Sequence, residues 1–313
     1  MPAAVDHLSD SDDEPKPRPG RTGSSAAPEE PSCASTSPPQ RARQTSKVMG
    51  QRRVNKRRRD DLPGLLNPVG TSTLAELRGL LPVGLLCLEL CCGATAGLTT
   101  SLLALGLPAV GLDYKLSLVH DMLNPALQGL ILALVVSRSL KYVHLGIPCN
   151  TFSMARWPKL RSQTHPRGKP GLSPEDQAEI TYANRLTDFL CSVGHCAADA
   201  GVGVSIENPH NSMLWSYDQI VDLVGGRTCD MNVFHSCQYG VKWLKPTRVM
   251  CFNIALPGLN KLCDGQHQHE KLSGWTQFKG EKRTPTRKAT SYPDALCLEW
   301  AADVATHVHS SGS

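Results

Sequence analysis

The chain has 313 residues, of which 40% are hydrophobic, and its formal net charge is +5. That composition is sufficient for a buried globular core. The 12 cysteines follow no repeating spacing, and the sequence has neither a signal-peptide pattern nor an apolar run that could cross a bilayer, which argues against a secreted or membrane protein. We therefore expect an intracellular protein with mostly free thiols and no membrane partner.

The N-terminal segment, residues 1–61, contains almost no large apolar side chains and is predicted to be a disordered, basic tail. Its second half carries nine basic residues and no acid: Arg41, Arg43, Lys47, Arg52, Arg53, Lys56, Arg57, Arg58 and Arg59. The dense run from Arg52 to Arg59 favours import into the nucleus or contact with phosphate groups. The alternative is a solvated linker that its charge keeps extended.

The globular domain is predicted to span residues 72–309, and it begins with a helix over 72–80 and a buried strand over 83–90. The strand leads into a turn of small residues that contains Gly93 and Gly97, and then into a helix through Leu105. This unit is typical of the first crossover of a Rossmann-like sheet, where the backbone approaches a nucleoside ligand. The alternative is that Gly93 forms a plain turn and Gly97 a helix packing contact.

Two acidic residues follow at positions that suit the same ligand. The second predicted strand, residues 109–112, ends at Asp113, where a carboxylate can accept hydrogen bonds from both hydroxyls of a ribose. Asp121 lies in the next loop, where it can cap the following helix or contact an adenine amino group, and capping is the simpler explanation. Apolar residues 127–136 then predict a helix.

The stretch from Val143 to Ser153 contains the candidate nucleophile. A predicted strand over residues 142–146 runs into a turn that Pro148 fixes, and we expect the strand to stop at Ile147 and present Cys149. Open α/β sheets bind ligands at the carboxyl ends of their strands, so the thiol lies where chemistry is expected. The alternative is that Cys149 is one of many buried, inert cysteines.

A basic loop, residues 156–171, follows the thiol and is expected to be mobile and to close over a phosphate backbone. Ser173, Pro174 and two acids then predict the capped start of a long helix. A buried strand over residues 202–206 comes next and ends at Glu207.

Several of these segments resemble, in order, the motifs of one enzyme family. Pro148-Cys149-Asn150-Thr151-Phe152-Ser153 and the later Glu207-Asn208-Pro209 are similar to the catalytic motifs of the cytosine-C5 DNA methyltransferases. The glycine turn from Glu89 to Gly97 resembles that family's S-adenosylmethionine motif. Two further pairs of segments fit the later motifs: Gln238-Tyr239-Gly240 with Lys245-Pro246-Thr247-Arg248, and Thr286-Arg287-Lys288-Ala289 with Tyr292-Pro293. The resemblance runs from about Leu85 to Trp300.

The resemblance implies a Rossmann-like methyltransferase sheet with helices on both faces, and a small C-terminal recognition segment over about residues 248–283. It implies methyl transfer from S-adenosylmethionine to carbon 5 of cytosine in DNA. Cys149 would add to carbon 6 of the ring and Glu207 would contact N3 as the general acid. The implied cofactor-binding residues are Glu89, Cys91, Gly93, Gly97, Leu98, Asp113, Tyr114, Asp121 and Pro148. The implied substrate-binding residues are Asn150, Ser153, Asn208, Lys245 and Arg248.

Three departures from the family pattern keep two other functions open. The glycine turn is one residue longer than usual, Lys242 and Lys245 replace arginines, and only about 35 residues separate Arg248 from Arg283. An RNA cytosine methyltransferase is the first alternative. A catalytically inactive nucleic-acid-binding module with the same fold is the second.

A cluster of cysteines and histidines near the C-terminus is a candidate metal site. Cys263, His267 and His269 lie close together in the sequence, and either Cys237 or Cys251 could supply a fourth ligand to zinc. Because the spacing matches no standard zinc finger, structural histidines and free thiols are the favoured interpretation and zinc is the alternative.

Overall fold

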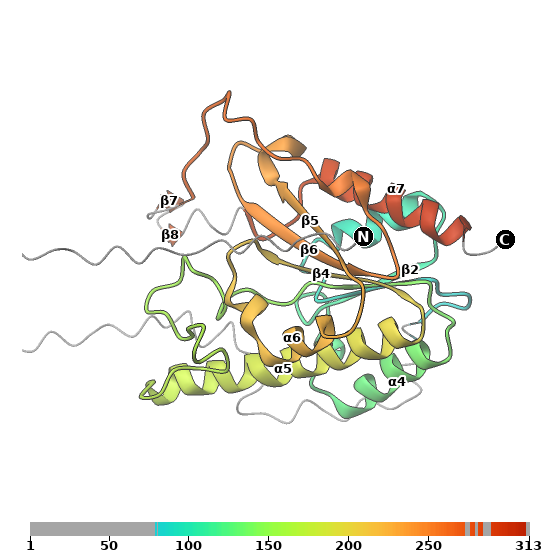
Figure 1. Cartoon of the computed structure of the whole chain (residues 1–313), viewed down its shortest axis with the longest axis horizontal. Helices are drawn as coiled ribbons and strands as arrows, with labels where there is room; N and C mark the ends of the chain where they lie inside the picture. Colours follow the sequence, from blue (N-terminus) through green and yellow to red (C-terminus); the bar gives the residue numbers. More distant parts are fainter. Residues whose placement is uncertain (1–78, 80, 273–275, 279–280, 284–288, 311–313) are drawn as a thin grey trace, which may run out of the picture. The chain divides into compact units, whose positions relative to one another are not determined.

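The computed structural model of the chain describes residues 79, 81–272, 276–278, 281–283 and 289–310 (Figure 1). The chain divides into a unit of residues 1–54 and a unit of residues 55–313, and the described residues all belong to the second. The predicted tail, its basic run and nearly all of the predicted helix over 72–80 lie outside the described residues.

A six-stranded sheet forms the centre of this unit, in the order β2-β1-β3-β4-β6-β5. The four strands β2, β1, β3 and β4 are parallel, whereas β6 is antiparallel to both of its neighbours. The strands are β1 Cys87–Leu90, β2 Ala109–Leu112, β3 Tyr142–Leu145, β4 Gly203–Pro209, β5 Asp230–His235 and β6 Pro246–Phe252. The predicted α/β class is therefore confirmed, and the sheet is compatible with a Rossmann-like fold.

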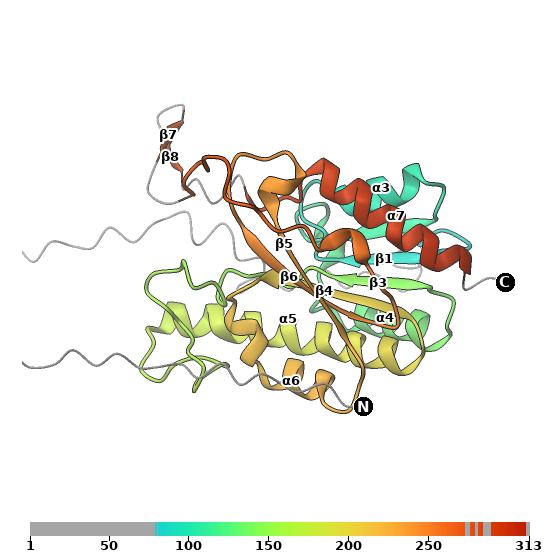
Figure 2. The same cartoon turned by 45° about the horizontal axis from the view of Figure 1, so that its top comes forward.

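Helices cover both faces of the sheet, as predicted (Figures 1 and 2). One face packs against α4 Pro125–Val136, α5 Pro174–Asp199 and α6 Asp218–Val224. The other face packs against α3 Gly97–Ala104 and α7 Asp294–Ser310. Short elements complete the unit: 3-10 turns η1 Leu118–His120, η2 Met213–Ser216, η3 Ser236–Tyr239 and η4 Pro257–Leu259, and a ribbon of β7 Thr276–Phe278 and β8 Glu281–Arg283. Among the described helices, none has the length and apolar character needed to cross a membrane.

Local sequence signals explain most of the element boundaries. Ser173 caps α5, since its hydroxyl accepts a hydrogen bond from the Asp176 amide, and Pro174 occupies the first turn. The predicted strand over 83–90 is wrong in its first half, because Val83 is fully exposed and Gly84 adopts a left-handed φ of 76°. A turn therefore precedes the strand, which starts at Cys87.

The reversed strand β6 is the feature that shapes the site. Pairing of β6 with β4 sets Asn208 opposite Arg248 and Glu207 opposite Val249. The predicted recognition segment over residues 248–283 thus begins inside the main sheet, because β6 continues to Phe252. The same pairing brings Lys245, which precedes β6, to the end of β4 where Glu207 lies.

Candidate active site

Cys149 lies in the loop that follows β3. The strand itself ends at Leu145, two residues earlier than expected, and the chain then continues to the exposed Pro148. The Cys149 carbonyl accepts hydrogen bonds from the Phe152 amide at 3.1 Å and the Ser153 amide at 2.8 Å. These bonds close a tight turn immediately after the half-buried thiol.

The buried side chain of Arg161 anchors this turn from behind. Its Nε and Nη2 donate to the Thr151 hydroxyl at 3.1 and 2.9 Å, and its guanidinium lies 3.8 Å from the centre of the Phe152 ring. Burial lowers the pKa of Arg161 to about 10, so the guanidinium stays charged at neutral pH. Sequence analysis missed this role, because nothing local distinguishes Arg161 from the other basic residues of its loop.

The loop over residues 156–171 was expected to close over phosphate, but its arginines Arg156 and Arg167 already pair with carboxylates of the protein. Arg156 forms two hydrogen bonds with the Glu179 carboxylate, at 2.8 and 2.9 Å. Arg167 pairs with Asp188 at 2.6 Å and with Asp218 at 3.0 Å. Carboxylates of α5 and α6 thus already neutralise both guanidinium groups, which makes the two arginines poor phosphate ligands.

Asn208 connects the Cys149 loop to β4. The side chain is fully buried, and its Nδ2 donates to the Ile147 carbonyl at 2.7 Å while its Oδ1 accepts from the Ser212 hydroxyl at 2.6 Å. The amide is therefore satisfied within the protein. This geometry argues for a positioning role in place of the predicted contact with substrate.

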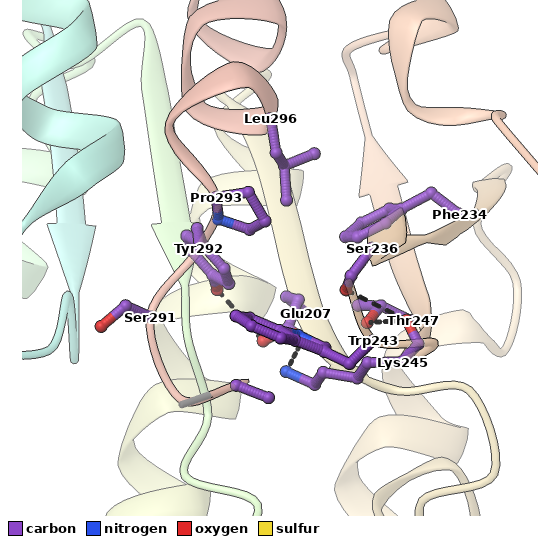
Figure 3. A pocket seen from close by; sticks show the side chains of 11 residues that line it. Glu207, Phe234, Ser236, Trp243, Lys245, Thr247, Ser291, Tyr292, Pro293 and Leu296 are labelled. Atoms are coloured by element: carbon purple, nitrogen blue, oxygen red, sulfur yellow. Dashed lines mark hydrogen bonds and ion pairs between the residues drawn. The ribbon is translucent and has the colours of Figure 1, made fainter. Parts of the chain in front are cut away.

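Glu207 lies in a small pocket between β4, the start of β6 and the segment before α7 (Figure 3). Its Oε2 accepts a hydrogen bond from the Tyr292 hydroxyl at 3.1 Å, and its Oε1 lies 3.7 Å from Lys245 Nζ. Oε1 is buried and accepts no hydrogen bond from the described residues. A buried carboxylate oxygen in that state is available to a ligand. Trp243 and Tyr292 line the walls of this pocket, which is partly open to solvent.

A buried hydrogen-bond chain extends from Glu207 through the sheet. It links, in order, Trp300, Tyr142, Ser205, His144, Tyr292 and Glu207, with distances of 2.8, 2.5, 2.8, 3.0 and 3.1 Å. The indole at one end can only donate, and Glu207 Oε2 at the other end accepts from Tyr292, so each hydroxyl donates toward Glu207. Burial lowers the pKa of His144 to about 3, and the imidazole is neutral with its proton on Nε2.

The thiol of Cys149 interacts electrostatically with this pocket. Burial raises its pKa, the nearby Lys245 ammonium opposes that rise, and the Glu207 carboxylate adds to it. The three groups come from separate parts of the chain: the loop after β3, the strand β4 and the segment before β6. The structure therefore brings together both predicted catalytic residues and one predicted substrate-binding residue.

The predicted cofactor residues surround the turn after β1. Gly93 adopts a left-handed φ of 70°, and a Cβ at this position would meet open space. Its amide donates to Asp113 Oδ2 at 2.9 Å, and the Lys115 amide donates to Asp113 Oδ1 at 2.8 Å. Cys91 and Ala96 also have positive φ angles, of 60° and 44°. Such strained backbone persists where the surrounding structure enforces it, and it is concentrated at functional sites.

Glu89 is buried at the base of this turn. Its Oε2 accepts from the Thr99 amide at 2.8 Å and from the Thr99 hydroxyl, so the carboxylate caps the first turn of α3. Oε1 accepts no hydrogen bond from the described residues. Burial raises the pKa of Glu89 to about 7, which leaves the group able to hold or release a proton near neutral pH.

Asp121, another cofactor candidate, lies in the loop between η1 and α4. Asp121 Oδ1 accepts from the Leu123 amide, whereas Asn124 caps α4, so the expectation that Asp121 caps the helix is wrong. Burial raises the pKa of the Tyr182 hydroxyl on α5, and the nearby Asp121, Cys91, Tyr114 and Asp113 add to that rise. Sequence analysis did not identify Tyr182, because a tyrosine on an amphipathic helix has no distinctive local signal.

Gly97 and Leu98 serve packing. A Cβ on Gly97 would lie 3.0 Å from Cys297 Sγ, and Leu98 is fully buried between the sheet and α7. The simpler of the two interpretations, a helix packing contact, therefore accounts for Gly97.

The other predicted substrate-binding residues are spread around the site. Asn150 is exposed and Ser153 is half-buried. The Arg248 guanidinium lies 5.1 Å from the centre of the Trp215 ring. Thr286, Arg287 and Lys288 of the last motif lie outside the described residues, whereas Tyr292 of that motif contacts Glu207 directly.

No protein-family model matches the chain, and no curated protein matches it. The assignment of a function therefore depends on the residues and their geometry.

Proposed function

We propose that this chain transfers a methyl group from S-adenosylmethionine to carbon 5 of cytosine in DNA. The observation that supports the proposal most is the convergence of Cys149, Glu207 and Lys245, which lie far apart in the sequence and interact in one place. A thiol, a carboxyl group and a cation are the side chains that activation of a cytosine ring requires.

Cys149 has the central role in this proposal. Carbon 5 of cytosine is a weak nucleophile until a thiolate adds to carbon 6 of the ring. The Sγ–C6 bond forms, and the electron pair of the C5–C6 double bond shifts toward carbon 5 and the N3 side of the ring. The Lys245 ammonium favours the thiolate needed for this addition, because it opposes the effect of burial on the Cys149 pKa. Bound S-adenosylmethionine would supply the methyl group to carbon 5 and would leave as S-adenosylhomocysteine. A base would then remove the carbon-5 proton, and elimination would break the Sγ–C6 bond and regenerate the thiolate.

Glu207 acts on the base edge in the same scheme. A carboxyl group that contacts N3 donates a hydrogen bond or proton as negative charge develops on the ring, a contribution of roughly 10²–10⁴-fold in rate. Tyr292 holds one oxygen of Glu207, and the other accepts no hydrogen bond from the described residues. The hydrogen-bond chain through neutral His144 keeps Tyr292 oriented toward Glu207.

The residues after β1 and β2 fit the proposed cofactor. S-adenosylmethionine supplies an electrophilic methyl carbon when it is bound. The backbone at Gly93 is free of side-chain obstruction, and Asp113 has further lone pairs for ribose hydroxyls, since each of its oxygens accepts a single amide in the structure. We include in this proposal a methyltransferase type of Rossmann-like sheet, DNA as partner and a nuclear location conferred by the run from Arg52 to Arg59.

A covalent trap tests the proposal. DNA and RNA oligonucleotides that carry 5-fluorocytosine are incubated with the full chain and S-adenosylmethionine, and adducts are located by mass spectrometry. We expect a DNA adduct at Cys149, because fluorine cannot leave as the carbon-5 proton does. Cys149→Ser should form no adduct, Glu207→Gln should form it about 100-fold more slowly, and the control Cys196→Ser should match the unmodified chain.

The two other functions have distinct outcomes in the same experiment. An adduct formed only with RNA would show that the substrate is RNA and not DNA. Binding of either nucleic acid without any adduct, in the presence of cofactor, would contradict the enzymatic proposal and favour a binding module.

A further inference from the structure

Four potential metal ligands meet beside η3, outside the proposed catalytic residues. The ligand atoms of Cys237, Cys263, His267 and His269 all lie within 4.8 Å of one another. Cys237 belongs to η3, and the other three belong to the loop after η4. The fifth residue considered from the sequence, Cys251, is buried in β6 and hydrogen-bonds to Asn232 instead.

The distances in this cluster suit tetrahedral coordination. Bond lengths of 2.3 Å for zinc–sulfur and 2.0–2.1 Å for zinc–nitrogen place neighbouring ligands of a tetrahedron about 3.3–3.8 Å apart. Cys263 Sγ lies 3.5 Å from His269 Nε2 and 3.8 Å from His267 Nε2. The two distances from Cys263 Sγ to the imidazoles are therefore those that one small ion would impose, and all four ligand atoms lie within 4.8 Å of one another.

The groups around these four side chains are placed like those that orient the ligands of a bound metal ion. His267 Nδ1, the ring nitrogen remote from Cys263, lies 3.8 Å from Asp264 Oδ1. The Gly265 amide donates to Cys263 Sγ at 3.3 Å, and the Cys263 amide donates to His235 Nδ1 at 3.0 Å. A carboxylate behind a histidine ligand and an amide directed at a sulfur are both typical of metal centres.

The loop itself has few other sources of order. Residues 260–272 contain no helix or strand, and most of them are exposed. Long loops without secondary structure are uncommon in compact domains unless something binds them together. This loop returns to the pocket wall, since the Glu270 amide donates to the Lys242 carbonyl next to Trp243. An ion in the cluster would thus fasten the segment that carries Trp243 and Lys245.

We propose that Cys237, Cys263, His267 and His269 bind one structural zinc ion. Two thiolates and two imidazoles in a tetrahedron select zinc over calcium or magnesium, which prefer oxygen ligands. Four protein ligands complete the tetrahedron, so the site has no open position for a substrate or water. The role is to hold the loop against η3 and the segment before β6.

Metal content of the full chain, purified without a histidine tag, tests the proposal directly. We expect one zinc per chain by elemental mass spectrometry, and about none in Cys263→Ser or His269→Ala. Cys229→Ser and His309→Ala alter a thiol and an imidazole outside the cluster, and both should retain the zinc. Replacement by cobalt should give the visible absorption of a tetrahedral site with sulfur ligands.

Two results would overturn the zinc site. One is a wild-type chain that contains less than about a tenth of an equivalent of zinc and gains none on incubation with the ion. The other is a disulfide between Cys237 and Cys263 in protein purified under reducing conditions. Both are measured on the unmodified chain, so they stand even if a variant fails to fold, and neither depends on methyl transfer.

Discussion

Lys245 is the charged residue that interacts with both Glu207 and Cys149. Its ammonium lies 3.7 Å from the Glu207 carboxylate and opposes the rise that burial causes in the Cys149 pKa. A single cation thus acts on a carboxyl group and a thiol. The family that the chain resembles has arginines in this region, but lysine is a compact point charge, which suits a role between two anions better than a planar guanidinium does.

Removal of that cation should make the thiol less acidic. In Lys245→Gln the pKa of Cys149 should rise further above its ordinary value, because burial and Glu207 then act without the opposing charge of Lys245. Only the thiolate reacts with iodoacetamide, so alkylation of Cys149 at pH 8 should slow by roughly tenfold for each unit of added pKa. The rate would be measured by mass spectrometry of the Cys149 peptide across a pH series.

The matched control for this experiment is Lys242→Gln, which removes an exposed lysine three residues earlier. Its pH profile should coincide with that of the unmodified chain. A Lys245→Gln profile that also coincides with it would show that Lys245 does not act on Cys149.

At the scale of elements, the loop after β3 is held between a strand and a helix. Asn208 of β4 hydrogen-bonds to the Ile147 carbonyl just before the Pro148 turn. Arg161 contacts both Thr151 and the Asn184 side chain of α5. These links fix the position of Cys149 relative to Glu207, because Glu207 and Asn208 are neighbours on the same strand.

The Asn208 link can be tested without a change in side-chain size. Asn208→Asp keeps the acceptor for Ser212 but replaces the donor to the Ile147 carbonyl by an oxygen. A buried carbonyl without its donor costs about 1–3 kcal/mol, so the free energy of unfolding in urea should fall by that amount. Limited proteolysis should cut the chain near Cys149 sooner than in the unmodified chain.

Gln163→Ala is the control, since Gln163 is an exposed residue of the neighbouring loop. It should change the free energy of unfolding by less than about 0.5 kcal/mol. Equal stability of Asn208→Asp and the unmodified chain would show that the link does not hold the loop.

At the scale of the molecule, the chain separates into two units at residues 54 and 55, and every described element belongs to the second. The first unit and the residues that follow it contain the nine basic residues between Arg41 and Arg59. Within the loop over 156–171, Arg156, Arg161 and Arg167 are occupied by internal partners. The proposal of DNA binding therefore assigns much of the phosphate contact to the N-terminal residues.

Deletion of residues 1–61 should separate binding from folding. The melting temperature should stay the same, because these residues include almost no large apolar side chains that could pack on the domain. DNA affinity should become less steeply dependent on salt, by about 0.9 in the logarithmic slope for each phosphate group that the shortened chain no longer neutralises. Affinity would be measured by fluorescence anisotropy over a salt series.

A full-length variant with the nine basic residues replaced by glutamine serves as the control for chain length. It should reproduce the weaker salt dependence of the deletion. A fall in melting temperature on deletion would show that the N-terminal residues pack on the second unit.

The sequence by itself determined the features that depend on neighbouring residues. The α/β class, β2, α4, the capped start of α5 and the turn that presents Cys149 follow from apolar periodicity, caps and the fixed φ of proline. These signals act within a few residues and are readable in the chain.

Only the tertiary structure decided which distant side chains meet. The reversal of β6 brings Lys245 to Glu207, and the return of the loop after η4 brings Cys263, His267 and His269 to Cys237. Arg161 became buried while the basic residues around it remained at least partly exposed. Such outcomes depend on strand pairing, desolvation and the partners available in space, and residues that look alike in the sequence acquire different roles through them.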